Sequence, residues 1–374
     1  MKFKTWVEIS RAAIAHNVKT LRRLLAPKTK LWTVVKSNAY GHGLLTFSEV
    51  AAPLVDGFCV DSVVEGLKLR KNGVKKPILV LGPTLPLNSL KEAYTNDITL
   101  TVSNLEALTK LLKEKHPPRF HLKIDTGMHR QGFYLNELPA AIHQVKSHRS
   151  LVKSSLLTGA YTHFASAKDL NYPTFTDFQF HAFKKAIRLL EHAGFKNLVK
   201  HAAATGATFI NQEYHLDAVR IGIGLYGLWP SKELELQFGS NITLEPVLSW
   251  KSIVSEVKKI EKGGYVGYDL VERVIRPTTM AIIPIGYWHG FDRGLSSVGE
   301  VLIRGKRARV LGRVSMDLIV VDVDGILCRM GDTAILIGAQ GRGTIPAQEL
   351  AAKIGTSHYE VVTRLNPLIE RVLI

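Results

Sequence analysis

Short apolar runs alternate with amphipathic segments over the first two-thirds of the chain. The runs are rich in β-branched residues, which is typical of buried strands. They lie at Leu31–Lys36, Phe58–Ser62, Ile78–Gly82, Ile98–Val102, Phe120–Ile124, Leu156–Thr162, Leu198–Ala202 and Ala218–Ile221. Segments with helical spacing separate most of them, such as Leu105–Lys113 and Phe178–His192. Strands that alternate with helices pair in parallel, so the pattern predicts a (β/α)8 TIM-type barrel.

After about residue 235 the pattern changes to strands separated by short turns, several of which contain glycine. The predicted strands are Val247–Lys259, Met280–Ile285, Val301–Ile303, Arg309–Leu311, Leu318–Asp322 and Ala334–Ile337, with one helix at Pro346–Ile354. We therefore predict a barrel domain over residues 1–235 and a β-rich C-terminal domain over residues 236–374. This division allows the extreme N-terminal residues to pack with the second domain.

Composition narrows the class of protein. Hydrophobic residues make up 46% of the chain and charged residues 22%, as in an ordinary globular enzyme. The net charge of +17 is scattered and accompanies no nucleic-acid-binding motif, so we expect no nucleic-acid partner. No apolar run approaches the roughly 20 residues that span a bilayer. Two cysteines and a first segment without a signal-peptide pattern predict a cytoplasmic protein.

Four polar side chains fall at the ends of predicted barrel strands, where barrel enzymes carry their active sites. They are Lys36, His163, His201 and Arg220. A lysine among apolar groups loses its charge more easily and can act as an amine nucleophile. The alternatives are a strand-end lysine that reaches water and histidines that belong to the core. No metal is expected, because no ligand spacing typical of a metal site accompanies the histidines.

Two other segments of the barrel domain could bind anions. Arg130, in the polar run Lys123–Arg130, could hold a carboxylate through two parallel N–H groups, although a surface ion pair among Lys123, Asp125 and Arg130 is an alternative. Gly222 and its neighbours could bring backbone amides to an anion, and Thr205 could add a hydroxyl at a helix N-terminus. Tight packing alone would also explain these glycines.

Two tyrosines of the second domain follow glycine, in Gly267-Tyr268-Asp269 and Gly286-Tyr287. An ordinary tyrosine, with a pKa of about 10, is a poor base at neutral pH unless positive charge lies nearby. Packing in a turn is the alternative role for each of them.

Taken together, the motifs match those of a known family over nearly the whole length of the chain. The matching segments are Trp6–Ile9, Val34–Gly43 around Lys36, Asp125–Phe133, Val219–Gly222, Leu225–Gly227, Pro284–Tyr287 and Gly312–Asp317. In this order they resemble bacterial alanine racemase, a fold-type III pyridoxal-phosphate-dependent enzyme.

The resemblance implies a role for each matching residue. Lys36 would hold pyridoxal 5′-phosphate as a Schiff base and act as one acid/base, with Tyr268 as the opposite base. The cofactor would also be held or lined by Tyr40, His163, His201, Thr205, Arg220, Gly222, Ile223 and Tyr359. The substrate would meet Arg130, the backbone of Met316 and the entrance residue Tyr287. A carbamylated Lys123 would steady Arg130.

The implied activity is the interconversion of L- and D-alanine by two bases, which supplies D-alanine for bacterial peptidoglycan. The implied assembly is a homodimer in which Tyr268, Tyr287 and Met316 come from the partner subunit. Three alternatives stay open: a racemase for serine or for several amino acids, a decarboxylase or aldolase of the same fold type, and a non-catalytic cofactor-binding protein.

The chain departs from the family pattern at three places. Trp288-His289 stands where the family usually has Ala-Asp after the entrance tyrosine, and Ala204-Thr205 stands where Asn-Ser is frequent. Asp269 replaces a common glycine beside the proposed base, and its carboxylate would oppose ionisation of that base unless it points away. These departures concern the entrance and the rate more than the class of reaction.

Overall fold

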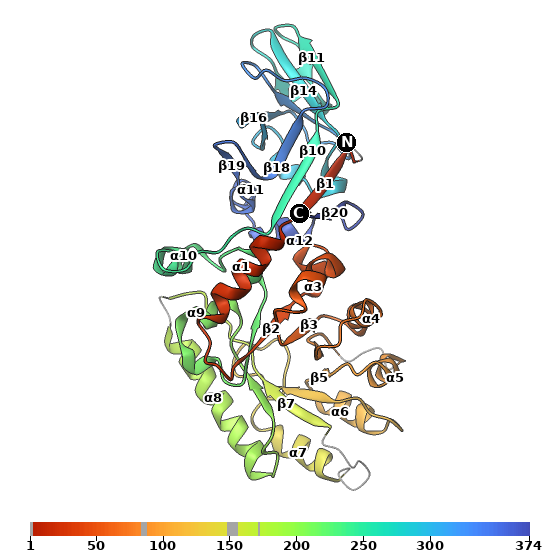
Figure 1. Ribbon diagram of the computed structural model, residues 1–374, viewed down its shortest axis with the longest axis vertical. Helices are drawn as coiled ribbons and strands as arrows, with labels where there is room; N and C mark the ends of the chain where they lie inside the picture. The colour runs from red at the N-terminus through yellow and green to blue at the C-terminus, as the bar shows by residue number, and fades with distance from the viewer. Residues whose placement is uncertain (1–2, 84–87, 148–155, 171–172) are drawn as a thin grey trace. The chain divides into compact units, whose positions relative to one another are not determined.

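The computed structural model describes residues 3–83, 88–147, 156–170 and 173–374. Contacts divide the chain into two compact units. The barrel unit comprises residues 13–37 and 48–245, and the β unit comprises residues 1–12, 38–47 and 246–374. Each unit is described by itself below (Figure 1).

Within the described residues, eight parallel strands form the barrel unit, as predicted. They are β2 (Lys30–Val34), β3 (Gly57–Val60), β4 (Ile78–Val80), β5 (Leu100–Val102), β6 (Phe120–Lys123), β7 (Leu157–Tyr161), β8 (Val199–His201) and β9 (Ala218–Ile221). Nearly every residue of these strands is buried, as expected for a sheet covered on its outer face by helices and filled on its inner face.

The strands close into a cylinder. Ladders run in the orders β4-β3-β2-β9 and β5-β6-β7-β8. Two isolated parallel bridges, Leu79↔Thr99 and Ala204↔Arg220, join these two sheets at both edges. The prediction of a (β/α)8 barrel is therefore confirmed.

Helices follow the strands in sequence. They are α1 (Arg11–Arg22), α3 (Leu44–Ala51), α4 (Val63–Lys71), α5 (Asn88–Thr95), α6 (Leu105–Leu112), α7 (Leu138–Ser147), α8 (Pro173–His192), α9 (Thr205–Ile210) and α10 (Lys232–Phe238). The predicted helices at 105–113 and 178–192 are confirmed, although α8 begins earlier, at a proline whose missing N–H costs nothing in the first turn. None of the helices in the described part of the chain combines the length and apolar character of a membrane span.

Two rings, those of Trp32 and His121, lie side by side in the barrel interior toward the amino ends of the strands. The Trp32 and His121 ring centroids lie 5.9 Å apart. A Cβ on Gly57 would lie 2.8 Å from the Trp32 ring, and one on Gly159 would lie 2.5 Å from the His121 ring. These two glycines are therefore required by the rings that they face.

A long mixed sheet makes up most of the β unit. Its strands are β1 (Thr5–Ile9), β10 (Leu248–Ile253), β11 (Glu256–Ile260), β14 (Thr278–Ile283), β15 (Glu300–Ile303), β16 (Lys306–Leu311), β17 (Ile319–Asp322), β18 (Thr333–Gln340) and β20 (Glu370–Leu373), in the order β11-β14-β17-β16-β15-β18-β10-β1-β20. β19 (Gly343–Ile345) pairs with β18, and β12 (Tyr265–Val266) pairs with β13 (Glu272–Arg273).

The prediction of one strand over 247–259 is wrong. The chain forms two strands because it changes partners between them: the Val254 N–H donates to the Asp332 carbonyl, whereas the Ser255 N–H donates to the Ile282 carbonyl. The N-terminal strand β1 was not among the predicted strands. It pairs antiparallel with β10 and parallel with β20.

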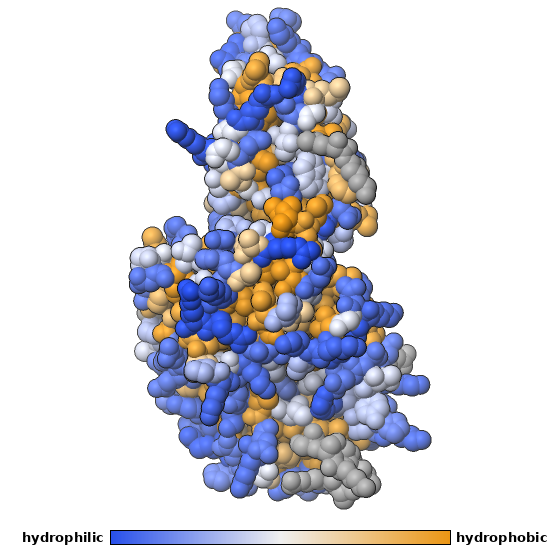
Figure 2. All heavy atoms as spheres, viewed as in Figure 1, coloured by the Kyte–Doolittle hydropathy of each residue, from blue (hydrophilic) through white to orange (hydrophobic). Residues whose placement is uncertain are grey.

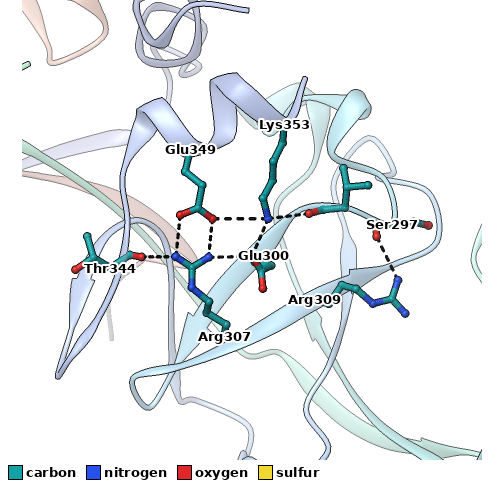
Figure 3. Close-up of polar contacts among 8 residues, drawn as sticks. Ser297, Glu300, Arg307, Arg309, Thr344, Glu349 and Lys353 are labelled. Atoms are coloured by element: carbon teal, nitrogen blue, oxygen red, sulfur yellow. Dashed lines mark hydrogen bonds and ion pairs between the residues drawn. The ribbon is translucent and has the colours of Figure 1, made fainter. Parts of the chain in front are cut away.

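An ionic network holds α11 (Ala347–Lys353) against the β15–β16 hairpin (Figure 3). Arg307 donates two hydrogen bonds to Glu349, of 2.5 and 2.7 Å. Glu300 accepts from Arg307 at 2.8 Å and from Lys353 at 2.7 Å. A bidentate arginine within a network is more stabilising than an isolated surface pair.

On the visible face of the molecule hydrophilic side chains predominate (Figure 2), while the apolar strand residues of both units are buried.

Candidate active site

The predicted strand-end residues of the barrel unit all lie at the carboxyl ends of the strands. His201 is the last residue of β8 and Arg220 lies in β9. Lys36 and His163 each follow the last residue of their strand by two positions, so the prediction that they end strands is off by that amount. Both residues lie beyond the hydrogen-bonded part of their strands, so their side chains need not follow the alternating inward and outward directions of strand residues.

The turn after Lys36 is left-handed. Ser37, Asn38, Ala39 and Tyr40 have φ between 53° and 56°. This conformation costs a residue with a Cβ roughly 1–2 kcal/mol, so four in succession need support from their surroundings. Such stored strain is typical of functional segments.

Glu65 supplies part of that support. Its carboxylate accepts the Ser37 N–H at 2.8 Å and the Asp61 N–H at 2.7 Å. Glu65 also belongs to the first turn of α4, where its own N–H donates to the N-cap residue Ser62. The Lys36 Nζ lies 3.8 Å from an oxygen of Asp61. Sequence reasoning missed both acids, although Ser-x-x-Glu before an apolar run is a recognised helix-start pattern.

Arg220 is the centre of a buried network. Its guanidinium donates to the carbonyls of Thr162 at 2.7 Å and Ala202 at 3.1 Å, and to His201 Nδ1 at 2.6 Å. His163 Nδ1 lies 3.4 Å from Arg220 Nη2. Every partner accepts, as a guanidinium requires.

The two histidines are neutral. Burial, followed by the charge of Arg220, lowers the pKa of His163 to about 3 and the pKa of His201 well below its usual value. The positive charge of this network therefore stays on the guanidinium of Arg220, which has no carboxylate among these partners.

Asp125 organises the loop that carries Arg130. Its carboxylate accepts the N–H groups of Gly127, Met128 and His129 at 2.9–3.0 Å and that of Arg130 at 3.1 Å. Burial opposes ionisation, but these backbone donors hold the pKa of Asp125 below its ordinary value. The carboxylate is thus a loop anchor, not one member of the surface ion pair that was the alternative interpretation.

We expect Asp125→Ala to lower the free energy of unfolding by about 2–4 kcal/mol, because it leaves buried donors without an acceptor. A depressed folded-state pKa means that this stability is present at neutral pH and is lost in acid, below the ordinary carboxyl pKa of about 4. Urea titrations at neutral pH and in acid measure both effects. Glu114→Ala, on an exposed carboxylate, is the control, and equal stability of the two variants would contradict the assignment.

Lys123 is buried beside this loop. Its Nζ donates to Gln131 at 2.9 Å and lies 5.8 Å from the Tyr161 ring centroid. Burial, and then the charges of Arg130 and Arg220, lower the pKa of Lys123 to about 8. An amine that is partly neutral near neutral pH is the form that carbamylation requires.

Thr205 and Gly222 come together at the start of a 3-10 turn, Ile223–Tyr226. The Thr205 hydroxyl accepts the Gly222 N–H at 3.2 Å. A Cβ on Gly224 would lie 2.7 Å from Thr205, so close packing requires glycine there. The packing interpretation is therefore confirmed for Gly224, and anion binding by Gly222 and its neighbours stays a prediction.

The β unit brings together the two other residues predicted to hold phosphate. The rings of Tyr40 and Tyr359 have centroids 6.2 Å apart, with Tyr359 in α12 (His358–Thr363). Burial, followed by Tyr40, raises the pKa of Tyr359, so its hydroxyl remains a hydrogen-bond donor at neutral pH. Gly41 fixes this arrangement, because a Cβ there would lie 1.8 Å from the Val362 carbonyl oxygen.

Tyr268 is exposed in the β unit. The residue beside it, Asp269, carries a carboxylate that is paired with two arginines. The Asp269 carboxylate lies 3.3 Å from Arg313 and 3.9 Å from Arg293. Asp269 has a φ of 65°, a conformation in which glycine is usually preferred. The two arginines offset the negative charge that this departure from the family pattern introduces next to Tyr268.

Tyr287, which was predicted to line the entrance, and Met316 lie on paired loops. The Tyr287 N–H donates to the Ser315 carbonyl at 3.0 Å, and the Trp288 N–H donates to the Met316 carbonyl at 3.1 Å. His289 is buried and accepts the Gly286 N–H at 3.2 Å. Of the two altered entrance residues, His289 therefore stabilises the turn, whereas Trp288 is exposed.

These features define a class of enzyme, a (β/α)8 barrel with a lysine, a buried arginine and neutral histidines at the carboxyl end of its strands. Family models described as "Alanine racemase, N-terminal domain" and "Alanine racemase, C-terminal domain" match residues 9–230 and 247–373. The chain therefore belongs to the alanine racemase family, and the resemblance drawn from its motifs is confirmed.

Individual relatives cover the chain nearly end to end. Alanine racemase of Leptospira interrogans is 35% identical over 100% of this chain and 96% of its own length. That of Methanococcus maripaludis is 37% identical over 98% of each chain. Among solved structures, alanine racemase from Bacillus anthracis with bound L-Ala-P has a TM-score of 0.92 at 32% identity, covering 100% of this chain and 96% of its own. The enzyme from Streptomyces lavendulae has a TM-score of 0.89 at 31% identity, covering 100% and 98%.

Proposed function

We propose that the protein is a pyridoxal 5′-phosphate-dependent racemase that interconverts L- and D-alanine. The observation that carries the proposal is the buried guanidinium of Arg220, hydrogen-bonded to carbonyls and a neutral imidazole at the end of the barrel that also carries Lys36. An arginine that stays charged there can donate to a pyridine nitrogen and keep it unprotonated. That weakens the electron sink and favours proton exchange over transamination.

The residues present fit the cofactor. Lys36 would bind it covalently. Thr205 with the backbone of Gly222 and Ile223 would hold its phosphate in the barrel unit, and Tyr40 and Tyr359 would add hydroxyl donors. His163 and His201 would line it. When bound, the cofactor withdraws electrons from the α-carbon of the amino acid and so acidifies the α-proton.

The remaining chemistry belongs to side chains. Arg130, on the loop anchored by Asp125 and steadied by a carbamylated Lys123, would hold the substrate carboxylate together with the backbone of Met316. Lys36 Nζ would exchange a proton on one face of the α-carbon, and Tyr268 Oη would exchange one on the other. Two bases on opposite faces invert the centre, whereas a single base would return the proton to its original face.

We further propose a homodimer with shared sites. The resemblance supports it, because in this family Tyr268, Tyr287 and Met316 are contributed by a second copy of the chain. The paired backbone of the Tyr287 and Met316 loops supports their acting as one surface. We propose a cytoplasmic enzyme whose D-alanine enters peptidoglycan.

An amino-acid panel tests the substrate. Purified protein supplied with pyridoxal 5′-phosphate should erase the optical rotation of L-alanine and of D-alanine at the highest kcat/KM, with serine slower. Equal or faster turnover of serine or of larger amino acids would replace alanine as the substrate. Release of carbon dioxide or of an aldehyde would indicate a decarboxylase or aldolase, and no turnover of any amino acid would leave a non-catalytic binding protein.

A further inference from the structure

A cavity lies at the opposite end of the barrel unit from Lys36. It has a volume of about 250 Å³ and is lined by residues at the amino ends of the strands, including Lys30 at the start of β2 and Arg119 just before β6. Barrel enzymes carry their chemistry at the carboxyl ends, so this cavity has no part in the reaction proposed above. Its volume suits a small molecule and exceeds what a single water fills.

The cavity is electropositive. Lys30, Lys75 and Arg119 contribute three cationic groups to its lining, against one carboxylate, Asp97. Asp97 is already paired, because Arg119 donates a hydrogen bond to its Oδ1. The two lysines therefore leave an excess of positive charge, which a bound anion would neutralise.

A chain of hydrogen bonds makes His121 a hydrogen-bond donor toward the cavity. Arg220 can only donate, so His201 Nδ1 accepts from it at 2.6 Å and the proton of His201 lies on Nε2. His201 Nε2 then donates to His121 Nδ1 at 2.9 Å, which leaves the proton of His121 on Nε2. Burial, and then Arg220, lower the pKa of His121 to about 3, so the ring is neutral. His121 lines the cavity, and its remaining ring nitrogen is an N–H donor.

We propose that this cavity binds a small oxyanion, a phosphate- or carboxylate-bearing molecule. Lys30 and Lys75 would supply the charge, and the remaining N–H of His121 would supply a hydrogen bond. A ring nitrogen that can only donate favours an anion over a cation or an apolar ligand, because neither of those offers acceptor oxygens.

Calorimetry tests the site on the full-length chain loaded with pyridoxal 5′-phosphate, so that the cofactor occupies its own phosphate site. Inorganic phosphate and citrate are titrated at an ionic strength held constant with chloride. We expect the double variant Lys30→Ala/Lys75→Ala to bind either anion at least tenfold more weakly. The control Lys185→Ala/Arg188→Ala removes two exposed charges from α8 that do not line the cavity, and should bind within twofold of the unaltered protein. Equal weakening in both double variants, or no binding of either anion to the unaltered protein, would overturn the proposal.

His121→Phe provides a second, independent measure, because it keeps a ring and removes the donor. We expect it to weaken binding several-fold, as the loss of one hydrogen bond to a charged group would. Unchanged affinity in a folded variant would remove His121 from the site and overturn the donor argument. Preference for phosphate or for citrate distinguishes the two sources of oxyanion, and either supports the site. Anion binding is measured without turnover, so failure of the racemase proposal and failure of this one are separate results.

Discussion

Lys36→Ala is expected to lower the rate of racemisation by at least about 10,000-fold, since it removes both the covalent attachment of the cofactor and one of two proton-transfer groups. The variant should fold, because the turn that follows Lys36 is held through the backbone N–H of Ser37, on Glu65, and not through the lysine side chain. The loss should therefore be chemical and not structural.

Absorbance spectroscopy separates these effects. The unaltered protein should be yellow with bound cofactor, and Lys36→Ala should lose the absorbance of the covalently attached form while keeping its circular dichroism. Lys185→Ala, which removes a lysine from the exposed face of α8, is the control and should retain both colour and activity. A yellow, covalently loaded Lys36→Ala protein would refute the assignment.

Tyr268→Phe should have the second largest effect, a loss of about 100- to 10,000-fold in kcat, the range of a single acid/base group. The effect should be asymmetric: exchange of the α-proton with deuterated water should be impaired more for one enantiomer than for the other. Tyr265→Phe removes a nearby exposed hydroxyl and should leave exchange unchanged. A small, symmetric loss in Tyr268→Phe would remove it from the proton transfer.

The same variant tests the shared site. Mixing inactive Lys36→Ala and Tyr268→Phe proteins should restore part of the activity, because a mixed dimer would hold one site with both bases intact. Light-scattering and labelled-subunit exchange verify that mixed dimers form. Exchange without any recovery would mean that both bases come from one chain.

The barrel could be predicted strand by strand because most of its strand residues are buried, so most of its strands are rich in apolar residues. The β unit was harder. Its shortest elements, Tyr265–Val266 and Glu272–Arg273, carry too few residues for a periodic signal. β10 and β11 were merged because the break between them is a change of partner strand, which leaves no mark in the local pattern.

The candidate functional residues likewise fall into those that the sequence identifies and those that only the structure reveals. Lys36, Arg130 and Arg220 could be found from their motifs. The roles of Glu65 and His121 could not, because each depends on a contact with a residue far away in the sequence: Glu65 with the Ser37 N–H, and His121 with His201. A weak signal for His121 existed, since it lies two residues before Lys123 and so faces the same side of β6.

The sequence by itself determined the class of fold and the chemical groups available at the carboxyl end of the barrel, because both depend on local periodicity and residue type. Only the tertiary structure decided the protonation states and the hydrogen-bond partners of these groups. It decided that the strained turn after Lys36 rests on Glu65, that the histidines around Arg220 are neutral, and that the cavity at the far end presents donors. The physical reason is that charge state and hydrogen-bond direction depend on burial and on partners, which lie far apart along the chain and become neighbours only on folding.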